Sequence, residues 1–546
     1  MIKRNKIKIV LLGIVSIFAT SCDVDRIPET VITDPAFWNN EADLKAAVNV
    51  LYFELPGLPE TSDNWSDDSY ATGPNSISDG TRLTPSSDGF YGNQYTGIRR
   101  ANNIIEKSQK VLETGVEPAV VDLYVGEARF FRAWNYFNLL RRYGGVPLIL
   151  RTLKENDPEL QAPKATREDV LTAIYEDLDF AASKLESPSE QSSSNYGRVT
   201  STAALAFKSR VALFEGTRAK FHSYGNPQKH LTIAKQAAKA VMDSGEHAIY
   251  SEYFDLFQYE GEGRSNKENI LVHQYGKSIE ESITSHVTQR NLETGAANPT
   301  KALADSYLMA DGLPIDKSPL YEEPTTTFEV FENRDPRMNA TFFKDGDEYI
   351  GTKPVFTVPD LNFQRTGFAN RRYAHLEDWQ NSRSYIDRAV IRYAEVLLNY
   401  AEATFELENG ISDTDLNISI NQLRSRPSVS LPGLTNTLVT ANGLNMREEI
   451  RRERRVELAL EGFRYWDLIR WKTAEIELPK PVLGNKLFAD FNLSEDETSS
   501  INFDADGNIL LQDASLREFD PSKDYLFPFP TDQLGLNKNL EQNPEW

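Results

Sequence analysis

The sequence predicts a mainly α-helical protein with one large irregular region, and three observations lead to this fold class. Several long stretches carry apolar residues at three- and four-residue spacing, the period of an amphipathic helix. Glycine or proline follows many of these stretches, as is typical where helices end. The segment from Tyr250 to about Trp379 differs, because it has short apolar runs, many glycines and prolines, and few long periodic stretches.

The first half of the chain predicts helices separated by turn signals. Gly144 and Gly145 stop one of these helices, and Thr166 is in position to cap the next. Consecutive helices have the lengths of helix-turn-helix solenoid units, although internal identity at the roughly 34-residue tetratricopeptide period is weak. The helices are predicted at residues 41–53, 97–112, 117–143, 167–185, 200–218 and 229–243.

A long polar loop, Glu60 to Tyr95, separates the first two of these helices. It is rich in Ser, Asp, Gly and Asn but contains several aromatic residues. A loop of this length inside a compact domain is usually functional or disordered. The aromatic residues favour a functional loop.

The second half predicts a few strands and further helices. Short strands are expected within the irregular region at 269–275 and 354–358, where apolar residues cluster. Helices are expected at 388–409 and 413–425, and a longer one at 446–471.

The 446–471 helix is the stretch around which we expect the chain to be organised. Asn445 is a plausible N-cap, and Glu448 three residues later would complete a capping box. One face is apolar, and the other carries arginines among glutamates, with Glu448 and Arg452 expected to pair. Gly462 is expected to bend or stop the helix. Because the glutamates nearly neutralise the arginines, the pattern favours a structural helix over a nucleic-acid-binding one.

The overall composition agrees with that interpretation. Among 546 residues, 81 acidic and 59 basic side chains give a net charge of −22. A general nucleic-acid-binding protein needs clustered positive charge. The apolar fraction of 40% is ample for a large core, and the aromatic fraction of 11% supplies stacking surfaces without locating one.

The N-terminus has the features of a lipoprotein signal peptide over residues 1–21. A basic start precedes the apolar run 9–18, and small residues lead to Cys22, the single cysteine of the chain. The apolar run is shorter than a transmembrane helix requires. We expect cleavage before Cys22 and acylation of its thiol, which would give stable membrane anchoring. The alternative is an ordinary signal peptide with an incidental cysteine.

Residues 22–40 are then expected to form a lipidated tether, in which Pro28 and Pro35 discourage helix. The remainder, 41–546, is expected to be a single domain.

The order of several stretches, together with the lipoprotein start, resembles the SusD/RagB family of Bacteroidetes nutrient-binding lipoproteins. Each stretch is individually modest, and Asn-Arg-Asp-Pro-Arg at 333–337 is one of them. The helix that ends near 425 lacks the family's usual Arg-Ala-Gly, which affects one local turn. The matching segments are 37–52, 98–105, 126–147, 196–204, 333–337, 391–403, 447–471 and 525–546.

The resemblance implies a SusD-like fold with four tetratricopeptide-like helix pairs, at about 97–245 and 388–472. The irregular region, at about 55–96 and 250–380, would form the ligand side. The protein would be anchored by its lipid at the cell surface of the outer membrane. There it would bind an oligosaccharide or polysaccharide and deliver it to a SusC-like TonB-dependent transporter. The resemblance implies no enzymatic activity, and no cofactor is expected.

Two other functions compete with glycan binding. Peptide or other non-sugar cargo fits the same role in uptake, and a secreted glycoside hydrolase is the less favoured alternative. Asp67 and Asp68 form an adjacent carboxylate pair, but neighbours on an extended loop are expected to point apart. The scattered histidines offer no metal-binding spacing. Asp504-Ala-Asp-Gly507 resembles the start of a calcium loop but lacks the distal glutamate.

Sugar binding calls for flat aromatic faces and planar polar side chains on framed loops. By analogy with the family, the contacts are expected on the loop after the first helix and in the irregular region. Packing within the loops is the alternative role for each aromatic residue. The candidate ligand contacts are Trp65, Asp67, Tyr70, Tyr91, Tyr275, Arg290 and Trp379.

Overall fold

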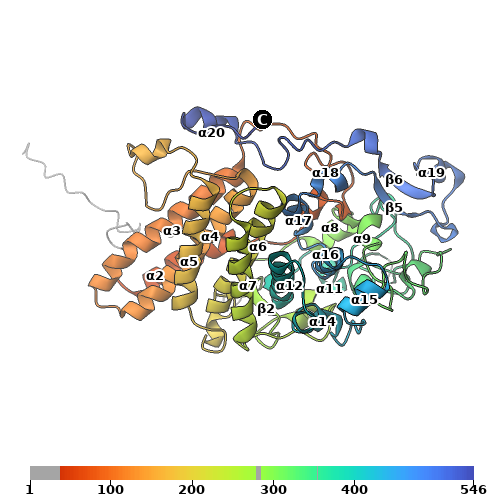
Figure 1. Ribbon diagram of the computed structural model, residues 1–546, viewed down its shortest axis with the longest axis horizontal. Helices are drawn as coiled ribbons and strands as arrows, with labels where there is room; N and C mark the ends of the chain where they lie inside the picture. The colour runs from red at the N-terminus through yellow and green to blue at the C-terminus, as the bar shows by residue number, and fades with distance from the viewer. Residues whose placement is uncertain (1–36, 278–283, 353–354) are drawn as a thin grey trace, which may run out of the picture.

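The structure, a computed structural model, describes residues 37–277, 284–352 and 355–546. The signal peptide expected at 1–21, Cys22 and most of the tether lie outside these residues. The protein is mainly helical, as predicted, and Figure 1 places the long N-terminal helices on one side and most of the short helices and loops on the other. Within the described residues, no helix has both the length and the apolar character needed to cross a membrane.

The first half forms an array of helices in which each one packs on the next along the chain. Gly144, with a φ of 79°, ends one of them where the sequence predicted. Another begins at Gly89, earlier than the predicted 97, because the Asp88 side chain caps it by accepting the Phe90 N–H. The helices are α2 (Glu41–Asn49), α3 (Gly89–Glu113), α4 (Pro118–Tyr143), α5 (Arg167–Lys184), α6 (Ser201–Phe221) and α7 (Pro227–Asp243).

The helix predicted at 388–409 begins as a strand. Residues Arg388–Arg392 form β4, which pairs with another strand and leads directly into α12 (Tyr393–Glu408). The helix predicted at 413–425 is divided into α13 (Asp413–Asn417) and α14 (Ile420–Arg424). Pairing with a distant strand thus decides the conformation of a segment that helical spacing alone assigns to a helix.

The arginine-rich stretch forms α16 (Met446–Glu457) and α17 (Arg464–Trp471), separated at the predicted Gly462, whose φ is 84°. Asn445 caps α16, as predicted, by accepting the Arg447 N–H. The expected pairing of Glu448 with Arg452 is wrong. Glu448 instead lies 3.5 Å from Arg451.

The strands form three small antiparallel pairs. The prediction at 269–275 is confirmed by β2 (Asn269–His273), which pairs with β4. The strand predicted at 354–358 is wrong in the described part of that segment, which has only an isolated bridge from Val355 to Glu348. The other pairs are β1 (Ser69–Tyr70) with β3 (Asn298–Pro299), and β5 (Val482–Lys486) with β6 (Asn508–Gln512).

Short helices connect these elements. The first 3₁₀ helix, η1, completes the helix predicted at 41–53. The short α-helices are α8 (Thr288–Glu293), α9 (Lys301–Ala304), α10 (Pro336–Thr341), α11 (Leu376–Gln380), α15 (Asn436–Ala441), α18 (Ala474–Glu477), α19 (Glu495–Ser499) and α20 (Thr531–Leu536). The 3₁₀ helices are η1 (Val50–Glu54), η2 (Ser62–Trp65), η3 (Pro158–Gln161), η4 (Ser193–Asn195), η5 (Asp255–Phe257), η6 (Tyr259–Gly261), η7 (Glu329–Phe331), η8 (Ala489–Phe491) and η9 (Ala514–Leu516).

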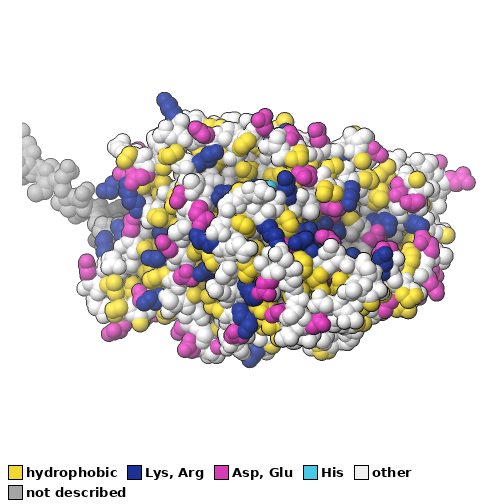
Figure 2. All heavy atoms as spheres, viewed as in Figure 1, with side chains coloured by type: hydrophobic (Ala, Val, Ile, Leu, Met, Phe, Trp, Pro, Cys, Tyr) yellow, Lys and Arg dark blue, Asp and Glu magenta, His cyan; other side chains and the backbone are white. Residues whose placement is uncertain are grey.

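The largest apolar core lies among α2 to α7 and extends to α17 and the C-terminal aromatic residues. The aromatic residues of α4, including Phe130 and Trp134, are buried in it. On the surface, acidic and basic side chains are interspersed, and Figure 2 shows lysines and arginines gathered near the middle of one face. Positive charge is therefore concentrated in one part of this face.

Candidate functional site

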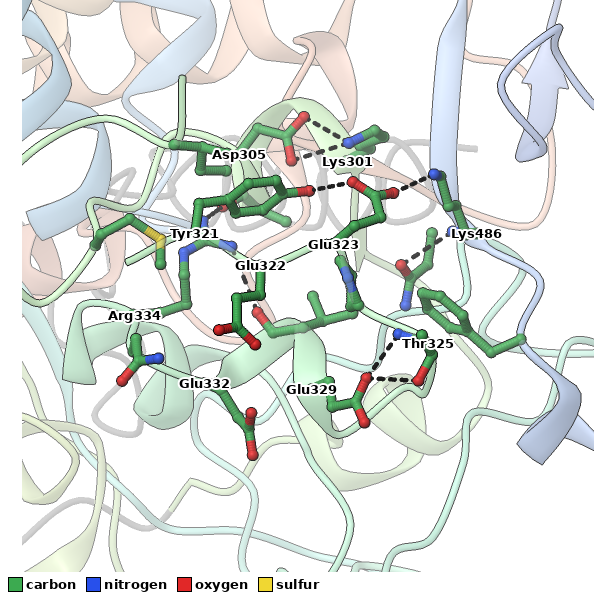
Figure 3. A pocket seen from close by; sticks show the side chains of 18 of the residues that line it. Lys301, Asp305, Tyr321, Glu322, Glu323, Thr325, Glu329, Glu332, Arg334 and Lys486 are labelled. Carbon is green, nitrogen blue, oxygen red and sulfur yellow. Dashed lines mark hydrogen bonds and ion pairs between the residues drawn. The ribbon is translucent and has the colours of Figure 1, made fainter. Parts of the chain in front are cut away.

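A pocket of about 340 Å³ lies in the irregular region and is the candidate ligand site. It is formed by α9, the segment from 315 to 334, and residues of the β5–β6 pair (Figure 3). Its volume lies near the lower end of the roughly 300–1,000 Å³ typical of small-ligand sites. We call it the loop pocket. Its polar and aromatic lining includes Lys301, Asp305, Tyr321, Glu322, Glu323, Glu329, Glu332, Asn333, Arg334, Asn485, Lys486 and Asn508.

Tyr321 is the exposed aromatic residue of the loop pocket, with 37% of its surface accessible. Its hydroxyl donates to Glu323 Oε2 at 2.8 Å, and Glu323 also binds Lys486 of β5 (Figure 3). Partial burial, and then the bond to Glu323, raise the pKa of Tyr321 to about 12. The phenol is therefore neutral and held in place while its ring keeps an accessible surface.

The floor of the loop pocket is held by Arg334. Its Nη2 donates to the carbonyl oxygens of Ala304 at 2.7 Å and Tyr307 at 2.9 Å. The preceding residue, Asn333, has a φ of 54°, a left-handed conformation that Asn tolerates better than most residues. Arg334 thus joins the two segments that form the pocket.

The carboxylates in the loop pocket outnumber the basic groups. Lys301 pairs with Asp305 at 2.8 Å, and Glu329 accepts the Thr325 N–H at 2.7 Å. Glu322 and Glu332 form no ion pair or side-chain hydrogen bond with any other described residue. Their oxygens are free to accept hydrogen bonds from a ligand. The arrangement suits hydroxyl groups or a cation better than an anion.

The candidate contacts predicted on the 60–95 loop lie elsewhere. Trp65 is partly buried against Tyr465 and Trp466 and lines a different cavity. Tyr70 is buried in β1. Tyr91 is buried against Tyr143, with ring centroids 5.4 Å apart. Each of these aromatic side chains packs against neighbouring residues, and Trp65 and Tyr91 also line cavities other than the loop pocket.

Asp67 is half-buried and pairs with two arginines. Its carboxylate accepts from Arg464 Nε at 2.8 Å and from Arg455 Nη2 at 3.0 Å, while Asp68 accepts from Arg455 Nε at 2.7 Å. The expectation that Asp67 and Asp68 point apart is therefore wrong. Both reach one guanidinium, because Arg455 projects from α16 between them.

The remaining candidates are spread over the irregular region. The Tyr275 hydroxyl accepts the Leu58 N–H at 2.8 Å. Arg290 is exposed and pairs with Glu293, and Trp379 packs against an apolar cluster. The candidates do not line the loop pocket. A ligand contact by any of them stays a prediction.

Sequence reasoning missed the residues that form the loop pocket. Tyr321 lies within the region expected to form the ligand side. Its position between two prolines, beside Glu322 and Glu323, is the sequence feature that could have indicated an exposed aromatic residue. Asn485 and Asn508 come from the β5–β6 pair, which is distant in sequence from Tyr321, so no local pattern assigns them to the site. The Asp504–Gly507 segment is a tight turn immediately before β6, where Asp504 accepts the Asn508 N–H at 2.8 Å. Among the described residues, no group of His, Cys, Asp or Glu is arranged to hold a metal ion.

The fold and the pocket together define a helical scaffold that carries a ligand-sized polar site in its loop-rich region. A model described as the SusD family matches residues 256–546, and a second, described as starch-binding associating with outer membrane, matches 62–213. The chain belongs to the SusD/RagB family, as the sequence predicted.

Relatives of similar length support this assignment. A SusD-like protein of Bacteroides ovatus is 25% identical and aligns over 99% of this chain and 98% of its own. A SusD-like protein of Formosa agariphila, P38, is 26% identical over 88% of this chain and 94% of its own. A solved SusD-like carbohydrate-binding protein of Bacteroides fragilis has a TM-score of 0.77 and 26% identity, covering 92% of this chain and all of that one.

Proposed function

We propose that this protein binds a neutral oligosaccharide in the loop pocket. The observation that supports this most directly is the exposed ring of Tyr321 beside the unpaired carboxylates of Glu322 and Glu332. An aromatic face packs against the C–H surface of a sugar, and carboxylates accept its hydroxyl hydrogens. The relative from Bacteroides fragilis, which is described as carbohydrate-binding, supports the same ligand class.

Calorimetric titration of the purified chain, residues 23–546, with a panel of neutral glycans tests this proposal. Tyr321→Ala is expected to weaken binding of the recognised glycan by about 10-fold or more, because the sugar loses its contact with the aromatic ring, which is worth on the order of 1–2 kcal/mol. Phe328→Ala is the matched control, because Phe328 is exposed in the same segment but does not line the loop pocket. Equal affinity in both variants, with both proteins folded, would refute the site.

A basic peptide is the second candidate ligand. The excess of carboxylates in the loop pocket favours it, because cationic side chains would neutralise Glu322 and Glu332. Titration with a lysine-rich peptide separates the two. Peptide binding that weakens in Glu322→Gln, with no response to any glycan, would favour the peptide.

We infer binding without catalysis. The pair Asp67 and Asp68, which was the carboxylate pair considered for hydrolysis, is engaged by Arg455 and Arg464. A glycosidase needs one carboxyl group free to donate a proton and another free to act as a base or nucleophile. Release of shorter sugars on prolonged incubation with the bound glycan would contradict this inference.

We also propose that the protein is held at the outer membrane by a lipid on Cys22 and delivers its ligand to a SusC-like TonB-dependent transporter. Family membership and the signal-peptide pattern support both statements. Cys22→Ala is expected to release the protein from the outer-membrane fraction, and the wild type is expected to co-purify with the transporter. Unchanged membrane retention of Cys22→Ala would argue against the lipid anchor.

A further inference from the structure

A second cavity, of about 280 Å³, lies between α4, α6, α17 and the segment that contains η1 and η2. We call it the central cavity. It shares no lining residue with the loop pocket. Trp65, Phe90, Phe463 and Trp466 give it aromatic walls, and several arginines line it as well. Its size suits a single sugar ring or a molecule of similar dimensions.

In the part of the chain that the structure describes, all the arginines that line the central cavity except Arg141 pair with carboxylates. Arg210 binds Glu395 at 2.6 Å, and Arg470 binds Glu402 at 2.5 Å. Arg142, Arg388 and Arg454 pair with Asp88, Glu60 and Asp467 respectively. These guanidinium groups are neutralised and held in place by the protein itself.

Arg141 differs from its neighbours. Within the described chain, its guanidinium forms no ion pair or hydrogen bond, and its Nε is buried without an acceptor. It lies over the ring of Trp466 at 4.5 Å and is 5.7 Å from that of Phe137. Burial, together with Arg210 and Arg142, lowers the pKa of Arg141 to about 9. A partly buried cation with unused donors is costly unless something accepts from it.

Other polar groups around the central cavity can accept or donate further hydrogen bonds. Glu54 lines it and has one oxygen, Oε1, buried without a hydrogen bond, although Arg100 lies 3.7 Å away. The side chains of Gln94 and Asn138 also line it and bind each other at 3.1 Å. A ligand with an anionic group for Arg141 and hydroxyl groups for these residues would match the lining.

We infer that the central cavity binds the oxyanion group of an acidic sugar, a carboxylate or a sulfate ester, through Arg141. A guanidinium presents a fork of donors that fits either group. Trp65 and Phe90 supply apolar surfaces for the sugar ring. This site is separate from the neutral-glycan site of the loop pocket, and neither depends on the other.

Titration calorimetry of the purified chain with glucuronate, glucose 6-sulfate and glucose tests the inference. Glucuronate or glucose 6-sulfate is expected to bind, and the one that binds identifies the oxyanion; glucose is expected to bind at least 10-fold more weakly. Arg141→Met is expected to weaken the acidic sugar about 10- to 100-fold, the range for a charge-assisted hydrogen bond. Tyr321→Ala is expected to leave this binding unchanged, which separates it from the loop pocket.

Arg451→Met is the matched control, because Arg451 also lies 4.5 Å from a tryptophan ring, that of Trp471, but outside the central cavity. Arg141→Met should melt no lower than the wild type, since it removes an unpaired charge. Arg141→Lys, which keeps the charge but loses the fork, provides a second variant and is expected to bind with intermediate affinity. The inference is overturned if neither acidic sugar binds the folded wild type, or if Arg141→Met and Arg451→Met bind them equally well.

Discussion

Arg337 and Glu453 form an ion pair of 2.7 Å between two side chains that are fully buried. Arg337 ends the 333–337 motif at the edge of the loop pocket, and Glu453 lies in the middle of α16. Arg337 also binds Asp335 at 2.7 Å and Glu457 at 3.0 Å. The 333–337 motif and the arginine-rich stretch of α16, which are distant in sequence, therefore form one structural unit, in which α16 holds the segment behind the site.

Replacing Arg337 with Met is expected to lower the free energy of unfolding by about 3–5 kcal/mol, because it leaves buried carboxylates without their partner. Urea denaturation measures this loss. Lys239→Met is the control, since Lys239 pairs with Asp243 on the surface, where a change of about 0.5 kcal/mol or less is expected. A loss as small for Arg337→Met as for the control would show that the buried network contributes little.

Buried carboxylates that pair with arginines make the stability of the protein sensitive to acid, and Glu402, which pairs with Arg470, is an example. Burial alone would raise the pKa of Glu402, but Arg470 outweighs it and lowers the pKa to about 2. A depressed carboxyl pKa contributes stability above the unfolded value of about 4.5, and this stability is lost as the pH falls toward 2. Trp471 also donates to Glu402, at 2.6 Å.

We therefore expect Glu402→Gln to be less stable than the wild type at pH 6, by about 2–3 kcal/mol. The difference should shrink as the pH falls from about 4.5 to 2, because the wild-type carboxylate becomes protonated. Urea titrations at pH 6 and pH 3 measure it. A constant difference across this range would mean that ionisation of Glu402 does not stabilise the fold.

The helices were predictable because their signals are local. Apolar spacing and a terminal glycine located α4, and Thr166 caps α5 in a capping box, as its position in the sequence suggested. The strand β4 was not predictable in this way, because its pairing with β2 is a contact between distant segments. The ion pair of Arg454 was not predictable from local spacing either, because its partner is Asp467 of α17 and not a neighbouring residue on α16.

The candidate site was only partly predictable for a related reason. The irregular region, expected to form the ligand side, contains the loop pocket, but the exposed aromatic residue of that pocket is Tyr321. Trp65 does line a cavity, the central one. Whether an aromatic side chain faces solvent or another ring depends on which distant segment packs beside it, and single-sequence spacing carries no record of that contact.

Asp67 provides a direct test of the two roles considered for it. If it mainly holds Arg455 and Arg464, Asp67→Asn should lower the free energy of unfolding by about 2–4 kcal/mol while the folded protein keeps its glycan affinity. Arg290→Ala is the comparison, because Arg290 is an exposed candidate contact whose loss should not affect stability. Reduced glycan affinity with unchanged stability in Asp67→Asn would restore Asp67 as a ligand contact.

Glu54 is expected to make the protein less stable as the pH rises, which is the opposite of the effect of Glu402. Burial raises its pKa to about 7, although Asn135 and Arg100 favour the charged form. A carboxyl group whose pKa is raised on folding stabilises the protein fully below about 4.5, and this contribution disappears as the pH rises through 7. Glu54→Gln cannot ionise, so it should become more stable than the wild type at pH 8, by roughly 1–3 kcal/mol, relative to their difference at pH 4.5. Urea denaturation at both pH values measures this, with Glu113→Gln as a control on an exposed carboxylate. If the relative stability of Glu54→Gln does not rise with pH, burial does not raise the pKa of Glu54 in the folded protein.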